Sequence, residues 1–142
     1  LNCENVISND KNEKSNTEYH LDALDFICQM YLDKRKFDLV DLDPFGSAYD
    51  CFDLAIKMAK KGLVITLGEL GHKRFKRLDF VRRYYGIETL EDFTTDNLVK
   101  HIIKIGERNK KTLIPIYVKD WRNIARVYFK IEKSETIYKG IK

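Results

Sequence analysis

The sequence has few of the residues that build covalently linked or metal-held scaffolds. Its 142 residues include three cysteines, Cys3, Cys28 and Cys51. Their number is odd and no two of them form a C-x-x-C pair, which argues against a disulfide framework or a zinc site. The three histidines share no metal-binding spacing either. We therefore expect a reduced, cytoplasmic protein with incidental thiols and no metal site.

Long apolar runs are also missing. No stretch approaches the roughly 20 apolar residues that a membrane-spanning helix needs, and no secretory signal opens the chain. Apolar residues make up 44% of the sequence and aromatic residues 12%, which is ordinary for a folded protein. We expect residues 1–142 to form a single domain with its own core. The first residue is leucine rather than methionine, which indicates a piece of a longer chain.

Positive charge is present in mild excess and is unevenly distributed. The formal net charge is +4, and nine lysines and arginines lie between Lys57 and Arg83 against two acids. Positive charge interleaved with aromatic rings is typical of a nucleic-acid surface, although the solvated face of an ordinary helix has a similar composition. The cations that we assign to such a surface are Lys73, Arg74, Lys76, Arg77, Arg82 and Arg83.

Strand-like and helix-like segments alternate along the chain, which predicts an α/β fold with a mostly parallel sheet. A hairpin at the C-terminal end adds an antiparallel strand. The expected strands are 5–7, 19–21, 37–42 and 63–67, and the hairpin strands are 112–118 and 124–131. Helices are expected from residue 23 on, over 47–62 and 73–85, and after 94–96.

The most informative segment runs from Phe37 to Ser47 and reads Phe-Asp-Leu-Val-Asp-Leu-Asp-Pro-Phe-Gly-Ser. Its apolar residues predict a buried strand, and Pro44 ends it because proline cannot donate a hydrogen bond to the neighbouring strand. Gly46 allows a tight turn, and Ser47 can cap the following helix. Open α/β sheets bind ligands at the carboxyl ends of their strands, so an acid, a proline and an aromatic ring there predict a functional site.

Three segments in order resemble the tRNA (guanine-N(2))-dimethyltransferase group of class I S-adenosylmethionine-dependent methyltransferases. They are Asn9-Asp10, Asp22-Ala23 with Phe26, and the segment from Asp41 to Ser47. The resemblance covers roughly residues 6–67 and implies a Rossmann-like methyltransferase sheet. It also implies an enzyme of tRNA processing, with S-adenosyl-L-methionine as cofactor and a nucleic-acid base, in first place guanine in tRNA and with DNA left open, as methyl acceptor.

The resemblance implies a catalytic role for Asp43, Pro44 and Phe45. The Asp43 carboxylate and the Pro44 carbonyl would accept the two hydrogens of the base amine, so that its nitrogen lone pair points at the methyl donor. Phe45 would stack on the base. Positioning of this kind is most of the catalysis, because the cofactor carries the reactive group. The alternative is a helix-capping turn, in which Asp and Pro are ordinary residues.

Cofactor binding is implied for residues of the first two segments. Asp10 would bind the ribose hydroxyls, Asp22 would contact the adenine amine, and Ala23 would lie beside the adenine ring. The sequence also allows purely local roles for both acids. Asp10 suits a turn closed by its own side chain, and Asp22 suits the N-cap of a helix.

Two other functions fit parts of the sequence. Asp41 and Asp43 alternate on one strand and so point to one face, as in metal-dependent glycosyl or nucleotidyl transferases. That interpretation leaves Phe45-Gly46 unexplained, and Asp41 is better explained as a paired residue within the sheet. A non-catalytic nucleic-acid-binding module on the same scaffold is the second alternative.

One part of the methyltransferase pattern is missing. The class places a glycine-rich cofactor loop after its first strand, upstream of the acid matched to Asp10, and this sequence has none. In the class, that strand lies between the strands that end at Asp10 and Asp43. Leaving its place empty exposes unpaired backbone groups. We therefore expect the C-terminal part of a cofactor-binding and catalytic domain, with a rearranged N-terminal stretch, self-association by strand exchange, or no bound cofactor.

Overall fold

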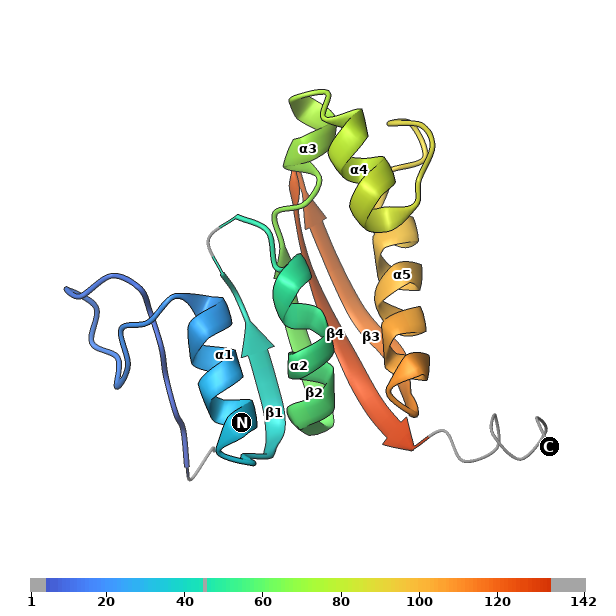
Figure 1. Ribbon diagram of the computed structural model, residues 1–142. Coiled ribbons are helices and arrows are strands. Elements are labelled where there is room, and N and C mark those ends of the chain that lie inside the picture. The colour runs from blue at the N-terminus through green and yellow to red at the C-terminus, as the bar shows by residue number, and fades with distance from the viewer. Residues whose placement is uncertain (1–4, 45, 134–142) are drawn as a thin grey trace.

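The computed structural model describes residues 5–44 and 46–133, which form a sheet with helices packed against it (Figure 1). Four strands make one sheet in the order β1-β2-β4-β3. They are β1 (Phe37–Leu42), β2 (Ala59–Leu67), β3 (Lys111–Trp121) and β4 (Ile124–Lys133). The helices are α1 (Ala23–Leu32), the 3-10 helix η1 (Tyr49–Cys51), α2 (Phe52–Met58), α3 (Gly71–Arg74), α4 (Leu78–Tyr85) and α5 (Thr95–Arg108).

The sheet is mixed rather than mostly parallel. β1 and β2 run parallel, with Leu42 opposite Ile65, whereas β4 is antiparallel to both β2 and β3. The α/β class and the C-terminal hairpin are therefore confirmed, and the expected excess of parallel pairs is wrong for these four strands. The reason is that β4 inserts between β2 and β3, so the hairpin contributes two antiparallel ladders instead of one.

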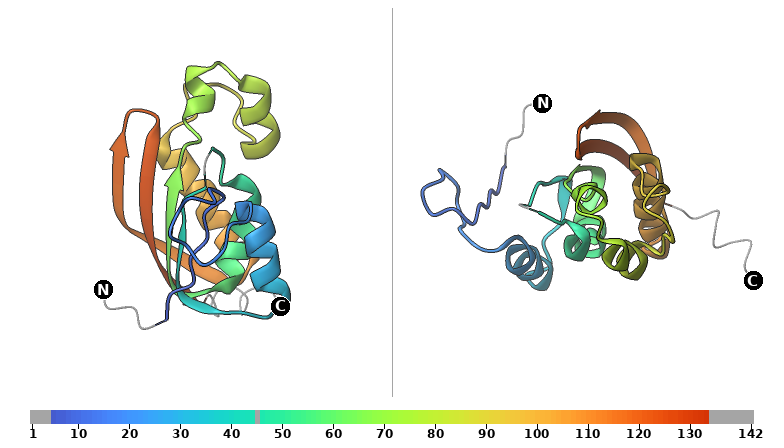
Figure 2. Two further views of the ribbon diagram at one scale, coloured as in Figure 1. Left: turned by 90° about the vertical axis from the view of Figure 1, so that its left-hand side faces the viewer. Right: turned by 90° about the horizontal axis from the view of Figure 1, so that it is seen from above.

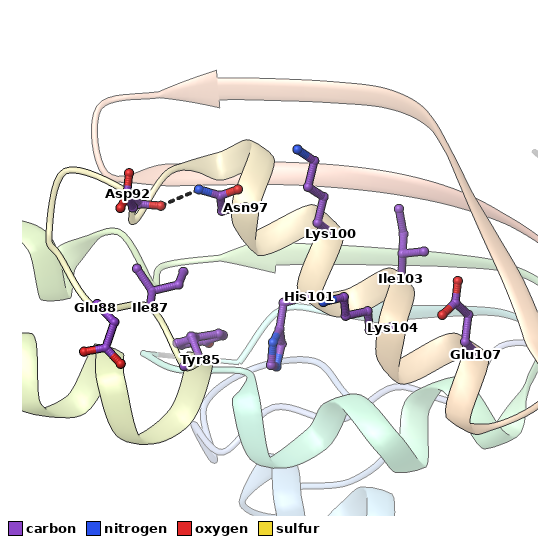
Figure 3. Close-up of a pocket in the computed structure, with 11 residues that line it drawn as sticks. Tyr85, Ile87, Glu88, Asp92, Asn97, Lys100, His101, Ile103, Lys104 and Glu107 are labelled. Carbon is purple, nitrogen blue, oxygen red and sulfur yellow. Dashed lines mark hydrogen bonds between the residues drawn. The ribbon is translucent and has the colours of Figure 1, made fainter.

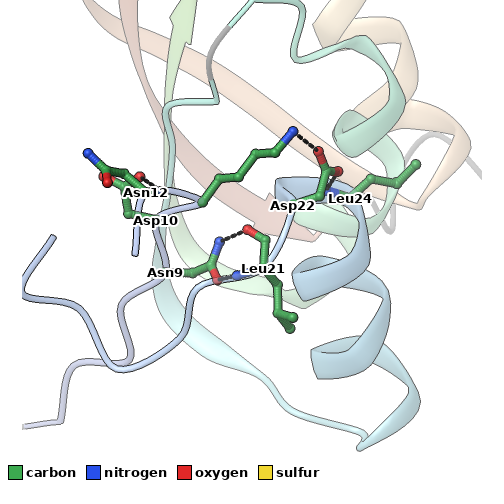
Figure 4. Close-up of polar contacts among 7 residues, drawn as sticks. Asn9, Asp10, Asn12, Leu21, Asp22 and Leu24 are labelled. Atoms are coloured by element: carbon green, nitrogen blue, oxygen red, sulfur yellow. Dashed lines mark hydrogen bonds and ion pairs between the residues drawn. The ribbon is translucent and has the colours of Figure 1, made fainter. Parts of the chain in front are cut away.

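The two strands predicted near the N-terminus are not formed as regular strands. A single parallel bridge joins Asn9 to Tyr19. Next to it, the Asn9 side-chain amide donates to the Leu21 carbonyl and its oxygen accepts from the Leu21 amide, each at 2.9 Å (Figure 4). Isolated two-stranded pairs are marginal in water. Within the described residues, no further strand supports this one.

The helices α1, α2 and α5 pack on one face of the sheet (Figure 2). The alternation along β4 follows from this, because Ala125, Val127 and Phe129 are buried while Arg126 and Tyr128 are only partly buried. None of the described helices covers the opposite face. The core therefore lies between one face of the sheet and the helical layer, in a two-layer arrangement.

Two helices differ from the sequence-based expectation. The predicted helix over 47–62 is shorter, because α2 ends at Met58 and the chain passes directly into β2. The half-buried Lys111 ammonium stabilises this abrupt change by donating to the carbonyl oxygens of Ile56 (2.6 Å) and Ala59 (2.7 Å). The predicted basic helix over 73–85 is divided into α3 and α4, since Lys76 adopts a left-handed backbone with φ 54°.

The helix starts that the sequence predicted at residues 23 and 94–96 are confirmed. The Asp22 side chain caps α1, and the Thr94 hydroxyl caps α5 by accepting from the Asn97 amide at 3.2 Å. Among the described residues, no helix is long and apolar enough to cross a membrane.

Candidate active site

The predicted catalytic segment lies where the sequence placed it, at the carboxyl end of β1 (Figure 1). Asp43 follows the last strand residue directly and is exposed, and Pro44 is half-buried. Phe45 lies outside the described residues. Gly46 has φ +86°, a left-handed conformation that favours glycine. The chain thus turns sharply just beyond the strand end and presents the Asp43 side chain to solvent.

The turn after β1 touches the turn after β2. A Cβ atom built on Gly68 would lie 3.1 Å from the Gly46 carbonyl oxygen, which is closer than side chains normally approach a backbone. A glycine at position 68 therefore lets the two turns pack backbone against backbone. This contact follows from the parallel pairing of β1 and β2, because parallel strands end at the same edge of a sheet.

Glu69, which the sequence analysis left without a role, is the central polar group between these two turns. Its side chain is fully buried, and it is the one buried charged residue among those described. One carboxylate oxygen accepts from the Ala48 amide at 2.7 Å, and the other accepts from the Ser47 hydroxyl at 2.9 Å. The signal in the sequence is an acid two residues after the end of an apolar strand, in Gly68-Glu69-Leu70-Gly71.

Burial sets the protonation of the groups around Glu69. It raises the pKa of the Glu69 carboxyl above its ordinary value, an effect that the hydrogen bonds from Ala48 and Ser47 partly oppose. The imidazole of His72 lies 3.8 Å from the carboxylate and stacks on the ring of Phe80, with a centroid separation of 3.8 Å. Burial, aided by the charge of Arg77, lowers the pKa of His72 and favours its neutral form.

Asp22 and Ala23 lie at the start of α1, and Asp10 lies in the segment before it, joined to Asp22 through the side chain of the neighbouring Lys11 (Figure 4). The Asp22 carboxylate accepts from the Leu24 amide at 3.1 Å and pairs with the Lys11 ammonium at 3.9 Å. The Asp10 carboxylate accepts from the Asn12 amide at 2.9 Å. The local roles that the sequence allowed, a turn for Asp10 and a helix cap for Asp22, are thus both formed. Their roles toward a cofactor stay predictions.

The predicted cationic surface is exposed and belongs to α3, α4 and the segment between them. This surface lies at the same end of the sheet as the turn after β1 (Figure 1). The guanidinium groups of Arg74 and Arg77 lie 5.8 Å and 5.4 Å from the ring centre of Phe75, which is 64% exposed instead of contributing to the core. Arg82 pairs with Glu88 at 3.1 Å. The exposed members are Lys73, Arg74, Lys76, Arg77, Arg82 and Arg83.

Asp41 is paired, as expected. Its carboxylate accepts from the Arg126 guanidinium at 2.8 Å, and the same guanidinium also donates to the Thr66 hydroxyl. These groups lie on the face of the sheet that no described helix covers. Within 5–44 and 46–133, no group of three or more potential ligands is arranged to hold a metal ion. Asp41 therefore acts here as an ion-pair partner of β4.

A groove of about 650 Å³ lies between the end of α4 and α5 (Figure 3). His101 and Lys104 of α5 and Tyr85 of α4 contribute to its lining. His101 contacts Tyr85 edge to face at 5.0 Å, and burial lowers its pKa. Both cationic and anionic side chains line the groove, and it contains none of the predicted site residues. We therefore place the candidate active site at the turns after β1 and β2.

The buried carboxylate predicts a pH-dependent stability. Because the native state raises the pKa of Glu69, it holds the proton more tightly than the unfolded state does, and stability falls as pH rises through the raised pKa. Replacing Glu69→Gln should flatten the fall in unfolding free energy that accompanies rising pH over the range above the ordinary pKa of a glutamate. Urea titrations across this range measure the effect. Three other titratable groups face Glu69, namely His72, Tyr85 and Asp50, and they remain in the variant. Glu132→Gln, which removes an exposed acid, is the control. An unchanged slope in Glu69→Gln would contradict the assignment.

Comparison with known proteins agrees with the family resemblance seen in the sequence. The sequence model of the family described as N2,N2-dimethylguanosine tRNA methyltransferase matches residues 2–141. No curated protein matches the chain. Among solved structures, the chain is similar to Trm1 from Pyrococcus horikoshii in complex with S-adenosyl-L-methionine, with a TM-score of 0.67 and 22% sequence identity.

The family match and the structural match cover different shares of the chain. The similarity to the solved structure covers 82% of this chain and 33% of the other, so the chain spans about a third of that relative. At this level of identity the likeness is one of fold. The family match is independent of it and extends over nearly all of the sequence. The chain belongs to the N2,N2-dimethylguanosine tRNA methyltransferase family.

Proposed function

We propose that the protein to which this chain belongs is an S-adenosyl-L-methionine-dependent N-methyltransferase that acts on a nucleic-acid base, namely guanine in tRNA. The observation that carries this proposal is the position of Asp43 and Pro44 at the carboxyl end of β1, in a chain of this family. Ligands of open α/β sheets bind at that edge. The matched Trm1 structure contains S-adenosyl-L-methionine, which supports the choice of cofactor.

The chemistry assigned to this chain is positioning. The exposed Asp43 carboxylate and the carbonyl of Pro44 accept the hydrogens of the base amine and direct its lone pair. Phe45 supplies the stacking surface for the base. The cofactor, when bound, supplies the methyl group on a sulfonium centre.

The cofactor is assigned to the groups near the start of α1. Asp10 and Asp22 are exposed, so their carboxylates are free to meet a ribose and an adenine, and we assign the partly buried Ala23 to the adenine ring. The Lys11–Asp22 pair is exposed and therefore weak, so it can yield to a ligand. These residues fit one half of a nucleoside cofactor, and no described loop fits the other half.

We further propose that this chain is the C-terminal part of a larger Rossmann-like cofactor domain. β1 is at the edge of the sheet, and no described strand pairs with its outer side. Leu39 of β1 itself is 42% exposed. The opposite face of the sheet also lacks a helical layer among the described residues. An open edge and an open face on one sheet favour a missing strand and helix.

This domain proposal predicts different behaviour for the chain and for the full-length protein. Titration calorimetry with S-adenosylhomocysteine should give binding with the full-length protein and none with residues 1–142 alone, because half of the cofactor site is missing. Size-exclusion chromatography with light scattering tests whether a second copy fills the edge of β1 by strand exchange. Tight cofactor binding by a monomer of residues 1–142 would refute the proposal.

The catalytic assignment predicts the effect of Asp43→Ala in the full-length protein. Methyl transfer to bulk tRNA should fall by at least about 100-fold, since the base amine loses one of its two acceptors, while affinity for S-adenosylhomocysteine stays within a few-fold. Asp38→Ala, an exposed acid on the same strand, is the control and should stay active. A fully active Asp43→Ala variant would contradict the catalytic role assigned to Asp43. If the wild-type protein binds tRNA but neither binds the cofactor nor methylates tRNA, a non-catalytic nucleic-acid-binding module is the better explanation.

The nucleic-acid surface is assigned to α3, α4 and their connection. Reversing Arg74→Glu and Arg77→Glu together should weaken tRNA binding and lower the slope of log affinity against log salt by roughly 0.7 to 0.9 for each phosphate that is no longer neutralised. Lys100→Glu with Lys104→Glu on α5 makes the same change in charge and is the control. Fluorescence anisotropy at several salt concentrations, with far-UV circular dichroism as a folding check, measures the effect. Equal reductions in tRNA affinity for both double variants would show that net charge alone matters, and would contradict a specific surface on α3 and α4.

A further inference from the structure

The turn after β1 needs an anchor at its far end. Its first residues are held by the sheet, because Leu42 is buried and pairs with Ile65 of β2. Beyond Gly46 the chain has left the sheet, and the next regular element is the short 3-10 helix η1. The hydrogen bonds that fix Ser47 and Ala48 to another part of the molecule are accepted by Glu69. Two bonds to one rigid carboxylate define position and orientation together.

The anchor continues into the next element. The Ser47 hydroxyl, which donates to Glu69, also accepts from the Tyr49 amide at 3.2 Å. Ala48 is completely buried, so its amide has no access to water and depends on Glu69 for its hydrogen bond. The carboxylate therefore fixes the start of η1 as well as the end of the turn. A change at Glu69 is expected to move both.

Glu69 also begins the segment that carries the cationic surface. Its carbonyl accepts from the His72 amide at 3.0 Å, and the Gly68 carbonyl accepts from the Gly71 amide at 3.1 Å, which starts α3. Lys73 and Arg74 follow within the same helix. A single residue thus joins the turn that positions the base to the helix assigned to phosphate contacts.

Burying this carboxylate has an energetic cost, because a charged group loses its hydration and the raised pKa of Glu69 reports that loss. An apolar residue would fill the same core volume without this cost. The carboxylate cannot act on substrate directly, since its side chain is 0% exposed. What it offers, and an apolar residue does not, is the fixed geometry of Ser47 and Ala48.

We propose that Glu69 is a positioning residue for methyl transfer, which fixes Ser47 and Ala48 so that Asp43 and Pro44 keep their productive geometry, and which links them to the cationic surface. This inference rests on the function proposed above. Displacements of about 1 Å at a positioning group can reduce turnover by about 100-fold. The loss should therefore appear in kcat, while the cofactor site near α1 remains intact.

The test uses three variants of the full-length protein. Glu69→Gln keeps the shape of the side chain but offers one acceptor oxygen instead of two, and Ser47→Ala removes one of the two bonds without changing a buried charge. Glu132→Gln, at an exposed acid that pairs with Lys130, is the matched control. We expect kcat for tRNA methylation to fall at least about ten-fold in Glu69→Gln and about three-fold or more in Ser47→Ala. The dissociation constant of S-adenosylhomocysteine should change less than about three-fold in both, and Glu132→Gln should behave as wild type.

The outcomes separate this inference from the proposed function. A wild-type protein without methyltransferase activity contradicts the proposed function itself. An active wild type with an equally active, folded Glu69→Gln variant overturns the positioning role. If Glu69→Gln does not fold, Ser47→Ala decides: a fall in kcat at unchanged cofactor affinity supports the inference, and full activity overturns it. Parallel losses of activity and cofactor affinity in folded Ser47→Ala indicate a general structural role and also overturn it.

Discussion

The parallel pairing of β1 with β2 determines where the candidate functional groups lie. With Leu42 opposite Ile65, both strands end at the same edge, and the chain turns away from the sheet twice at neighbouring points. Gly46 and Gly68 let these turns approach each other, and the carboxylate of Glu69 crosses from the second turn to the first. Antiparallel pairing would place one of the turns at the opposite edge. The site at Asp43 therefore depends on the direction of two strands.

The second constraint is the side of the sheet that remains open. β1 has an unpaired outer edge in the described residues, and the face carrying Asp41, Arg126 and Thr66 has no helical layer there. The Arg126 guanidinium donates to Asp41, Thr66 and the Tyr128 hydroxyl, so its charge is paired within the face. Such self-sufficient polar clusters can be covered by another layer without leaving a charge unpaired. The open face is thus compatible with the larger domain proposed for this family member.

The sequence predicted best those features that depend on local chemistry. Asp22 and Thr94 cap helices because an Asp or Thr side chain satisfies the first amides of any helix, and Pro44 ends a strand for reasons internal to one residue. The features that it missed depend on distant partners. The end of α2 at Met58 requires the ammonium of Lys111, from a strand much later in the chain, and the insertion of β4 beside β2 requires a choice between two sheet edges. The role of Glu69 depends on its approach to Ser47 and Ala48, which no spacing in the sequence encodes.

These dependencies divide the proposed active site into two parts with different requirements. The turn that would position the base is held by β1, β2 and Glu69, all of which belong to this chain. The residues that we assign to the cofactor, near α1, are held by a bridge between Asn9 and Tyr19 and by local bonds of Asp10 and Asp22, and no described sheet supports them. Local hydrogen bonds exposed to solvent open readily, whereas buried ones open only with the core. The proposed acceptor side therefore depends on β1, β2 and Glu69 of this chain, whereas the proposed cofactor side would depend on the further strand that we propose beside the open edge of β1.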